Sequence, residues 1–256
     1  IYFPDMQFGA ITGAGGGIVK TSNGGTNWVL NFAATQDLKA VFFIDSQNGW
    51  AVGDKGTIIH TSNGGATWTA QSSGTSYPLY DIFFINSQIG WSVGNSLGSK
   101  IFKTTNAGTT WSEAYSYNGA ALHNLFFLDS QTGWAVGSKI MKTTDGGTTW
   151  NIQIDDVGSA PYYAIQFKDS QKGWVAKGST VLRTTDGGGN WISFDSSLIT
   201  LARSLSFVNT QKGWAAHQTG CLKTIDNGET WQRCFINTSE GHIYAFFPDS
   251  MNGWVV

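Results

Sequence analysis

The sequence predicts an all-β fold, a β-propeller built from four-stranded antiparallel blades, and two observations support this prediction. All twelve tryptophans fall into two short motifs that alternate along the chain with a period of about forty residues. Each period also contains four short runs of β-forming residues separated by polar turns, without helical periodicity. A period of this length is typical of solenoids, arrays and propellers, and four antiparallel strands per repeat make one propeller blade.

The first motif has the form Thr-x-Asp/Asn-x-Gly-x-x-Trp and occurs six times. Its acid or amide residues are Asn23, Asn63, Asn106, Asp145, Asp186 and Asp226, and its tryptophans are Trp28, Trp68, Trp111, Trp150, Trp191 and Trp231. Asp and Asn side chains bond nearby backbone N–H groups, and glycine supplies a left-handed backbone position. The motif therefore predicts a structural hairpin turn rather than a catalytic site.

The second motif has the form Phe-x-Asp/Asn-Ser-Gln-x-Gly-Trp and carries the remaining tryptophans, Trp50, Trp91, Trp134, Trp174, Trp214 and Trp254. A degenerate copy opens the chain, with Ala10 in the tryptophan position. Burial of one indole contributes at most about 4–6 kcal/mol, so two per blade predict strong packing between neighbouring blades. Because a blade is buried on both faces only between two others, we expect a closed ring rather than an open array.

We expect one domain over residues 1–256. Its repeat units span 1–38, 39–79, 80–121, 122–161, 162–201 and 202–242, with a partial unit over 243–256. Seven first-strand phenylalanines, from Phe3 to Phe247, predict seven blades, of which six are complete and one is partial. Residues beyond either end would supply the missing strands. Six blades with an overlapping end is the alternative.

The turn motifs Thr61–Trp68 and Thr143–Trp150 resemble Asp-box (BNR) repeats. Together with the Gly-Trp-Ala-Val-Gly segments Gly49–Gly53 and Gly133–Gly137, they resemble the photosystem II assembly/stability factor-like propellers over the whole chain. This resemblance implies that the Asp-box is a turn between the third and fourth strands of a blade. It also implies an arginine-rich patch for binding a photosystem subunit, whereas this chain has three scattered arginines, Arg183, Arg203 and Arg233.

The position four residues before each anchoring phenylalanine varies between repeats and is polar or aromatic. It holds Lys39, Tyr80, His123, Tyr163 and Arg203, with His242 and Tyr244 near the equivalent place in the last unit. Aromatic and cationic side chains at the starts of neighbouring strands suit a peptide, a sugar or a carboxylate, so we interpret these residues as a ligand- or partner-binding rim. The alternative is that exposed strand starts simply accept long amphipathic side chains. The segments 71–78 and 115–121, with Tyr77, Tyr115 and Tyr117, would extend this surface as loops.

Enzyme chemistry has little support in the sequence. A sialidase needs three converging arginines, and we place Arg183 and Arg233 on outer strands, away from Arg203. A glycosidase needs paired carboxylates. The candidates outside the repeat motifs are Asp54, Asp155, Asp156 and Asp195, which we interpret as solvated loop residues. Four histidines without metal-ligand spacing predict no metal site, and we expect no cofactor.

Cys221 and Cys234 flank the sixth Asp-box, and a hairpin centred on that box would place them opposite each other. This arrangement is compatible with a disulfide and with two separate thiols. A disulfide would indicate an oxidising, extracytoplasmic compartment. The tripeptide Asn237-Thr238-Ser239 matches a glycosylation acceptor, although such tripeptides are frequent by chance.

Charged residues make up 12% of the chain and the formal net charge is −2, which excludes a typical nucleic-acid-binding surface. No apolar stretch is long enough to span a membrane. We therefore expect a non-catalytic, exported binding or assembly scaffold, secreted, periplasmic or on the cell surface, with a protein or carbohydrate partner. A glycan-active hydrolase and a structural segment of a surface filament or adhesin, in a larger multidomain protein, are the alternatives.

Overall fold

The computed structural model describes residues 1–96, 98–119, 121–156, 160–195, 201–217, 220–234, 244–249 and 251–255. Apart from two short 3₁₀ turns, η1 (Ala14–Gly16) and η2 (Asp54–Gly56), the regular elements in these ranges are β-strands. The strands form two compact units, residues 1–133 with 143–150, and residues 134–142 with 151–256. The predicted all-β propeller class is confirmed.

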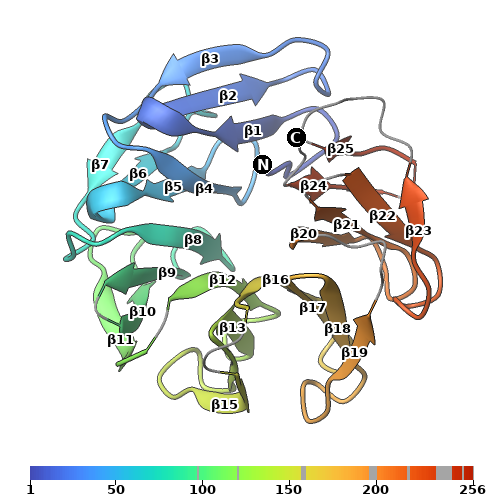
Figure 1. The fold of residues 1–256 in the computed structure, drawn as a ribbon. Coiled ribbons are helices and arrows are strands. Elements are labelled where there is room, and N and C mark those ends of the chain that lie inside the picture. Colours follow the sequence, from blue (N-terminus) through green and yellow to red (C-terminus); the bar gives the residue numbers. More distant parts are fainter. Residues whose placement is uncertain are drawn as a thin grey trace. The chain divides into compact units, whose positions relative to one another are not determined.

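The strands form antiparallel meanders in chain order (Figure 1). The first sheet contains β1 (Gly9–Thr12), β2 (Gly17–Thr21) and β3 (Val29–Phe32). A bridge between Tyr2 and Ala10 adds a fourth chain segment to it. The next two sheets contain β4 (Leu38–Phe43), β5 (Gly49–Gly53), β6 (Ile58–Thr61) and β7 (Thr69–Gln71), then β8 (Leu79–Phe84), β9 (Gly90–Ser96), β10 (Gly98–Thr104) and β11 (Ser112–Tyr117).

The later sheets repeat this plan. They contain β12 (Leu122–Phe127), β13 (Gly133–Gly137), β14 (Lys139–Thr143) and β15 (Asn151–Asp155); β16 (Tyr162–Phe167), β17 (Gly173–Lys177), β18 (Thr180–Thr184) and β19 (Ile192–Asp195); and β20 (Ala202–Phe207), β21 (Gly213–His217), β22 (Gly220–Thr224) and β23 (Gln232–Cys234). Within the described residues, the last sheet has two strands, β24 (Ala245–Phe246) and β25 (Trp254–Val255), which agrees with a partial final unit.

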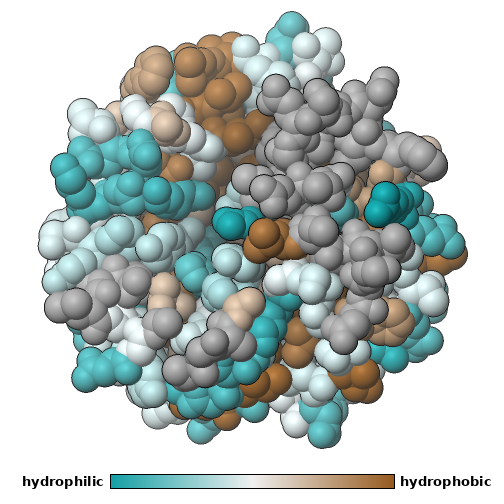
Figure 2. All heavy atoms as spheres, in the orientation of Figure 1, coloured by the Kyte–Doolittle hydropathy of each residue, from teal (hydrophilic) through white to brown (hydrophobic). Residues whose placement is uncertain are grey.

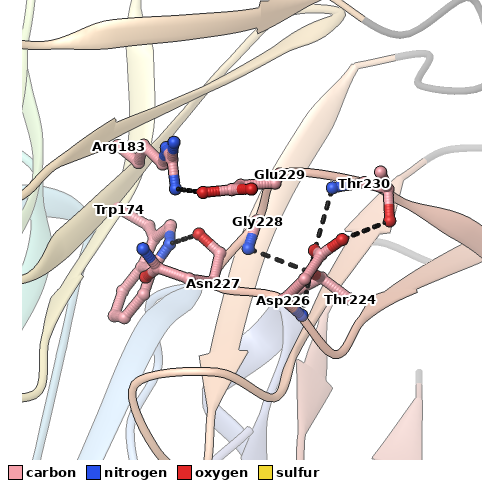
Figure 3. Close-up of polar contacts among 8 residues, drawn as sticks. All are labelled: Trp174, Arg183, Thr224, Asp226, Asn227, Gly228, Glu229 and Thr230. Carbon is pink, nitrogen blue, oxygen red and sulfur yellow. Dashed lines mark hydrogen bonds and ion pairs between the residues drawn. The ribbon is translucent and has the colours of Figure 1, made fainter.

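Each Asp-box forms the turn between the third and fourth strands of its sheet. In the sixth box, Gly228 N donates to Thr224 Oγ1 over 2.9 Å and Thr230 N donates to Asp226 Oδ1 over 2.9 Å (Figure 3). Asn227 and Gly228 have φ values of 66° and 80°, which satisfy the turn and favour glycine at the second position. The Thr hydroxyl and the Asp carboxylate thus replace the backbone hydrogen bonds that the turn interrupts.

The second-motif tryptophans stack flat on a phenylalanine of the following sheet. The ring centroids are 3.6 Å apart for Trp50–Phe84 and 3.6 Å apart for Trp91–Phe127. In the second unit, the same pairs are Trp134–Phe167, Trp174–Phe207 and Trp214–Phe247, at 3.5, 3.8 and 4.0 Å. Such stacking adds to the free energy gained by burying the two rings.

A first-motif tryptophan also meets the same phenylalanine, edge-on. The centroid distances for Phe84–Trp111 and Phe207–Trp231 are 5.9 and 6.0 Å, with interplanar angles of 89° and 88°. The glycine before each second-motif tryptophan also lies against a phenylalanine. A Cβ added at Gly213 would lie 2.3 Å from the Phe207 ring, so only glycine fits there. The two motifs therefore form one packing unit around each phenylalanine.

The first sheet departs from this pattern. Ala10 is fully buried and stands where the other repeats have tryptophan. The ring of Phe8, two residues earlier, packs edge-on against Phe43 at a centroid distance of 4.8 Å and an angle of 64°. A phenyl ring from the preceding turn therefore covers Phe43 in place of a stacked indole.

Two fully buried indoles of the second unit allow the contribution of an indole N–H hydrogen bond to the free energy of unfolding to be measured. Trp174 Nε1 donates to Asn227 O over 2.9 Å, whereas Trp134 Nε1 has no hydrogen-bond partner among the described residues. We expect Trp174→Phe to lower the free energy of unfolding by about 1 kcal/mol more than Trp134→Phe, because it also leaves a carbonyl without this donor. Urea unfolding of both variants measures the difference. Equal losses would contradict a role for the N–H group.

Candidate partner-binding rim

Four of the predicted rim residues occupy β-bulges in the first strands of their sheets. In β4, Leu38 pairs with Gly53 and Ala40 pairs with Val52, so Lys39 between them has no partner in the ladder. The same one-residue shift falls on Tyr80, Tyr163 and Arg203. A bulge breaks the regular alternation of side chains and re-aims the extra residue. These four positions therefore share one backbone arrangement, although their side chains vary among lysine, tyrosine and arginine.

In the first unit, the rim consists of Lys39, Tyr80 and His123 on β4, β8 and β12. These strands follow one another side by side, with β8 in contact with both β4 and β12. The rings of Tyr80 and His123 lie 5.4 Å apart at an angle of 52°. Lys39 Nζ lies 3.1 Å from Asp54 Oδ2, in the turn after β5. The structure thus brings an aromatic pair together next to a paired lysine.

In the second unit, Tyr163 on β16 and Arg203 on β20 form the rim. The Arg203 guanidinium lies over the Tyr163 ring at 4.8 Å from its centroid, while the arginine remains exposed. Tyr244 precedes β24 and is also exposed. His242 lies outside the described residues. A stacked arginine is held in one orientation but keeps N–H groups available for a ligand.

A layer of polar side chains behind the rim ties neighbouring first strands together. Asp81 Oδ2 accepts hydrogen bonds from Leu125 N, over 3.0 Å, and from Asn124 Nδ2, over 2.6 Å. Ser204 Oγ accepts from Ala245 N over 3.2 Å and donates to Ala245 O over 3.1 Å. These side chains satisfy backbone groups at the free edge of the next strand. The sequence patterns did not single out Asp81 and Ser204 as functional residues. The available signal was that polar residues stand at this strand position where other repeats have alanine.

Burial raises the pKa of Asp81 to about 7, although the hydrogen bonds from Leu125 and Asn124 lower it. Burial also lowers the pKa of His60 and of His217, which favours their neutral forms. His60 stacks on Trp50 at a centroid distance of 4.7 Å. Across the part of the chain that the structure describes, no three His, Cys, Asp or Glu residues group as metal ligands would.

Three of the four carboxylates considered for hydrolysis pair with a lysine. Asp54 pairs with Lys39, and Asp155 Oδ2 lies 2.6 Å from Lys139 Nζ. Asp156 pairs with Lys177 and accepts a hydrogen bond from the Tyr162 hydroxyl over 3.0 Å. The side chain of Asp195 is not among the described ones. These three carboxylates are therefore engaged in ion pairs with lysines.

The structure corrects two placements expected from the sequence. Tyr115 and Tyr117 lie in β11 rather than in a loop, because this strand runs further than the turn signals indicate. Arg183 lies in the third strand β18, directly before an Asp-box. Its guanidinium pairs with Glu229 of the next Asp-box at 2.8 Å (Figure 3). This arginine therefore joins two sheets.

Cys221 and Cys234 are register partners on β22 and β23, and both are free thiols. A hydrogen bond to Cys234 and burial raise the pKa of Cys221, and the same hydrogen bond lowers the pKa of Cys234. A disulfide between them stays a prediction. The tripeptide at 237–239 lies outside the described residues. Among the described elements, none is a helix long and apolar enough to cross a membrane.

The model of one protein family, the photosynthesis system II assembly factor YCF48, matches residues 1–111 and 116–199. The chain belongs to this family. The resemblance in the Asp-box and Gly-Trp motifs is thereby confirmed. No curated protein gives a significant match.

Solved structures show the same fold at low sequence identity. A structure of YCF48 bound to a D1 peptide has a TM-score of 0.78 at 19% identity, covering 99% of this chain and 87% of that chain. YCF48 from Cyanidioschyzon merolae has a TM-score of 0.77 at 16% identity, covering 97% and 88%. The GH74 enzyme of Niastella koreensis has a TM-score of 0.74 at 18% identity, but this chain covers only 44% of it.

The raised pKa of Asp81 predicts a pH dependence of stability. Between the unfolded pKa, near 4, and the folded pKa, about 7, the folded YCF48-family chain binds more protons than the unfolded chain. The free energy of unfolding should therefore fall as pH rises through this window, by at most about 4 kcal/mol for this group. In Asp81→Asn, which keeps a carbonyl acceptor, that part of the pH slope should vanish.

Urea unfolding at several pH values between 4 and 8 measures these slopes. Asp129→Asn is the matched control, because Asn86 and Asn209 fill the equivalent turn position in other repeats. The control should keep the wild-type slope. Identical slopes for the wild type and Asp81→Asn would show that Asp81 titrates normally.

Proposed function

We propose that this protein is a non-catalytic scaffold that binds an extended peptide segment of a protein partner at its rim. The observation that carries the proposal is the repeated bulge, which removes Lys39, Tyr80, Tyr163 and Arg203 from the regular ladder. The packing motifs recur around these positions with little change, but the bulged residue varies among lysine, tyrosine and arginine. Positions freed from packing in this way are suited to recognition.

The stacked pair of Tyr163 and Arg203 is the proposed anchor. Tyrosine and arginine are enriched among the residues that dominate binding energies, because both offer a large contact area together with hydrogen-bond donors. Stacking on Tyr163 orders the guanidinium before a partner arrives, which lowers the entropy cost of binding. A peptide with a carboxylate or backbone carbonyl oxygens would meet the exposed N–H groups of Arg203.

A peptide partner is also supported by the likeness to YCF48 bound to a D1 peptide. We transfer only the class of ligand, a peptide, from that protein to this one. A likeness at 19% identity shows the fold and does not identify the binding residues. A carbohydrate at the same rim is the second candidate ligand, because aromatic faces also bind sugars. The lysine-paired carboxylates make hydrolysis of such a sugar the less supported function.

We further propose that the protein works outside the cytoplasm, in the periplasm, in the medium or on the cell surface. Low charge and abundant Gly, Ser, Thr and Asn are the sequence features that support export. The facing cysteines of β22 and β23 support an oxidising compartment. A role as one segment of a surface filament or adhesin would be compatible with the same placement.

Binding to a peptide array that includes the D1 peptide, alongside a glycan array, tests the rim. We expect Tyr163→Ala and Arg203→Ala each to weaken peptide binding by about five- to thirtyfold, as loss of a contact worth about 1–2 kcal/mol does. Arg233→Ala is the matched control, because Arg233 is an exposed arginine of the same unit on β23. It should bind like the wild type.

Equal binding by wild type, Tyr163→Ala and Arg203→Ala would place the site elsewhere and refute the proposal. Binding to glycans alone, lost in the same two variants, would replace the peptide by a sugar. Circular dichroism of each variant shows whether the sheets are intact.

A further inference from the structure

Cys221 and Cys234 are the chain's two cysteines, and the strand register places them directly opposite each other. Cys221 lies in β22, the third strand of its sheet, and Cys234 ends β23, the outer strand. Direct partners in an antiparallel ladder project to the same face, with Cβ atoms about 4.5–5.5 Å apart. A disulfide needs about 3.5–4.5 Å between the same atoms. A small shift of the outer strand therefore brings the two sulfurs within bonding distance.

The two thiols share a hydrogen bond, but their surroundings differ. Cys221 is buried, with 2% of its surface exposed. Cys234 is half-buried and follows Gln232 and Arg233, which are both exposed. Figure 2 shows hydrophilic residues over this outer strand. A reagent dissolved in water therefore meets the sulfur of Cys234 before that of Cys221.

A lysine stands on the same face of the sheet as the two cysteines. Lys223 lies two residues after Cys221 in β22, so their side chains share one face. It is therefore a diagonal neighbour of Cys234. Its Nζ lies over the Trp214 ring, 5.4 Å from the centroid, which holds the cation on this face. The hydrogen bond from Cys221 lowers the pKa of Cys234, and the charge of Lys223 lowers it as well, whereas burial opposes both.

We propose that Cys221 and Cys234 form a reactive dithiol that exchanges with disulfide compounds, with Cys234 as the attacking sulfur and Cys221 as the resolving one. The thiolate of Cys234 attacks one sulfur of a disulfide RSSR, forms a mixed disulfide and releases RS⁻. Cys221 then gives up its proton and attacks the Cys234 sulfur, which expels the second RS⁻. The two RS⁻ ions take up the two protons that the cysteines released. One RSSR and two protein thiols thus become two RSH and one protein disulfide.

This bond would tie the outer strand to the rest of its sheet. β23 is three residues long and pairs with β22 along that length, whereas β22 pairs with β21 over five residues. A covalent link at Cys234 would fix the C-terminal end of this short strand. Arg203 lies in β20, two strands from β22 in the same sheet. The dithiol is therefore separate from the proposed rim, and it does not rest on the proposed function.

The probe is oxidised glutathione, added to the reduced intact chain, with mass spectrometry of the whole protein as the measurement. We expect the wild type to lose two hydrogen atoms and to release two molecules of glutathione per chain. Its melting temperature should rise on closure and return on reduction. Cys221→Ser should stop at a mixed disulfide on Cys234, because no resolving thiol remains. Cys234→Ser should react at least about tenfold more slowly than Cys221→Ser, because its remaining thiol is buried and less ionised.

Lys223→Met and Lys142→Met form a matched pair. Lys223→Met should slow the attack on oxidised glutathione several-fold, because it removes the cation beside the attacking sulfur. Lys142 lies over the Trp134 ring at 5.1 Å, as Lys223 does over Trp214, but its strand β14 carries no cysteine. Lys142→Met should therefore react at the wild-type rate.

A brief pulse of iodoacetamide on the reduced wild type, followed by peptide mapping, compares the two thiols directly and keeps the test decisive if a serine variant does not fold. Cys234 should be labelled at least about tenfold more than Cys221. The proposal is overturned if the two thiols react at equal rates, if both lysine variants react alike, or if oxidised glutathione leaves the chain unmodified. Uptake of two glutathione molecules, or linkage of two chains, in place of closure would overturn it as well.

Discussion

The flat contact between an indole of one sheet and a phenylalanine of the next is the interaction on which this structure depends. Trp91 and Phe127 illustrate it, with ring centroids 3.6 Å apart and Trp91 fully buried. The indole N–H then reaches the carbonyl of an Asp-box in the neighbouring sheet, so the box serves two purposes. It closes its own hairpin, and it offers a hydrogen-bond acceptor to the sheet before it. Packing and turn formation are therefore coupled within each repeat.

This coupling explains why the architecture could be predicted from the sequence. Tryptophan spacing, Asp-box turns and Gly-Trp pairs are patterns within short stretches of sequence. Each of them packs in the same way wherever it recurs between two sheets. Gly213 shows the constraint well, because any side chain there would overlap the Phe207 ring. The class of fold, the four-stranded blade and the facing register of Cys221 and Cys234 all followed from such local rules.

The features that were not predicted depend on contacts between repeats. The bulges at Lys39 and Tyr163 lie in first strands that pair with their own sheet and also contact the first strand of the next sheet. The buried position of Asp81 and its raised pKa follow from its approach to Leu125, 44 residues away in the sequence. To predict that Phe8 takes the place of an indole, one would have to know that its side chain folds back from the turn onto Phe43. No single-repeat pattern contains this information.

The proposed rim results from a departure from the strict repeat. The bulges place Lys39, Tyr80, Tyr163 and Arg203 outside the regular ladder, while the packing contacts around these positions recur between sheets. At the first junction the departure is filled instead, because Phe8 packs edge-on against Phe43 and Ala10 is fully buried. The proposed recognition chemistry at the rim is a stacked Tyr–Arg pair.

Hydrogen exchange of the indole N–H groups, followed by NMR of ¹⁵N-tryptophan-labelled protein, tests the central packing claim most directly. The N–H groups of Trp91 and Trp174 are enclosed between sheets and bonded to Gly146 O and Asn227 O. They should exchange only through global unfolding, at the rate of the slowest backbone amides in the strands. Exchange of these two protons within the time typical of exposed indoles would contradict the account.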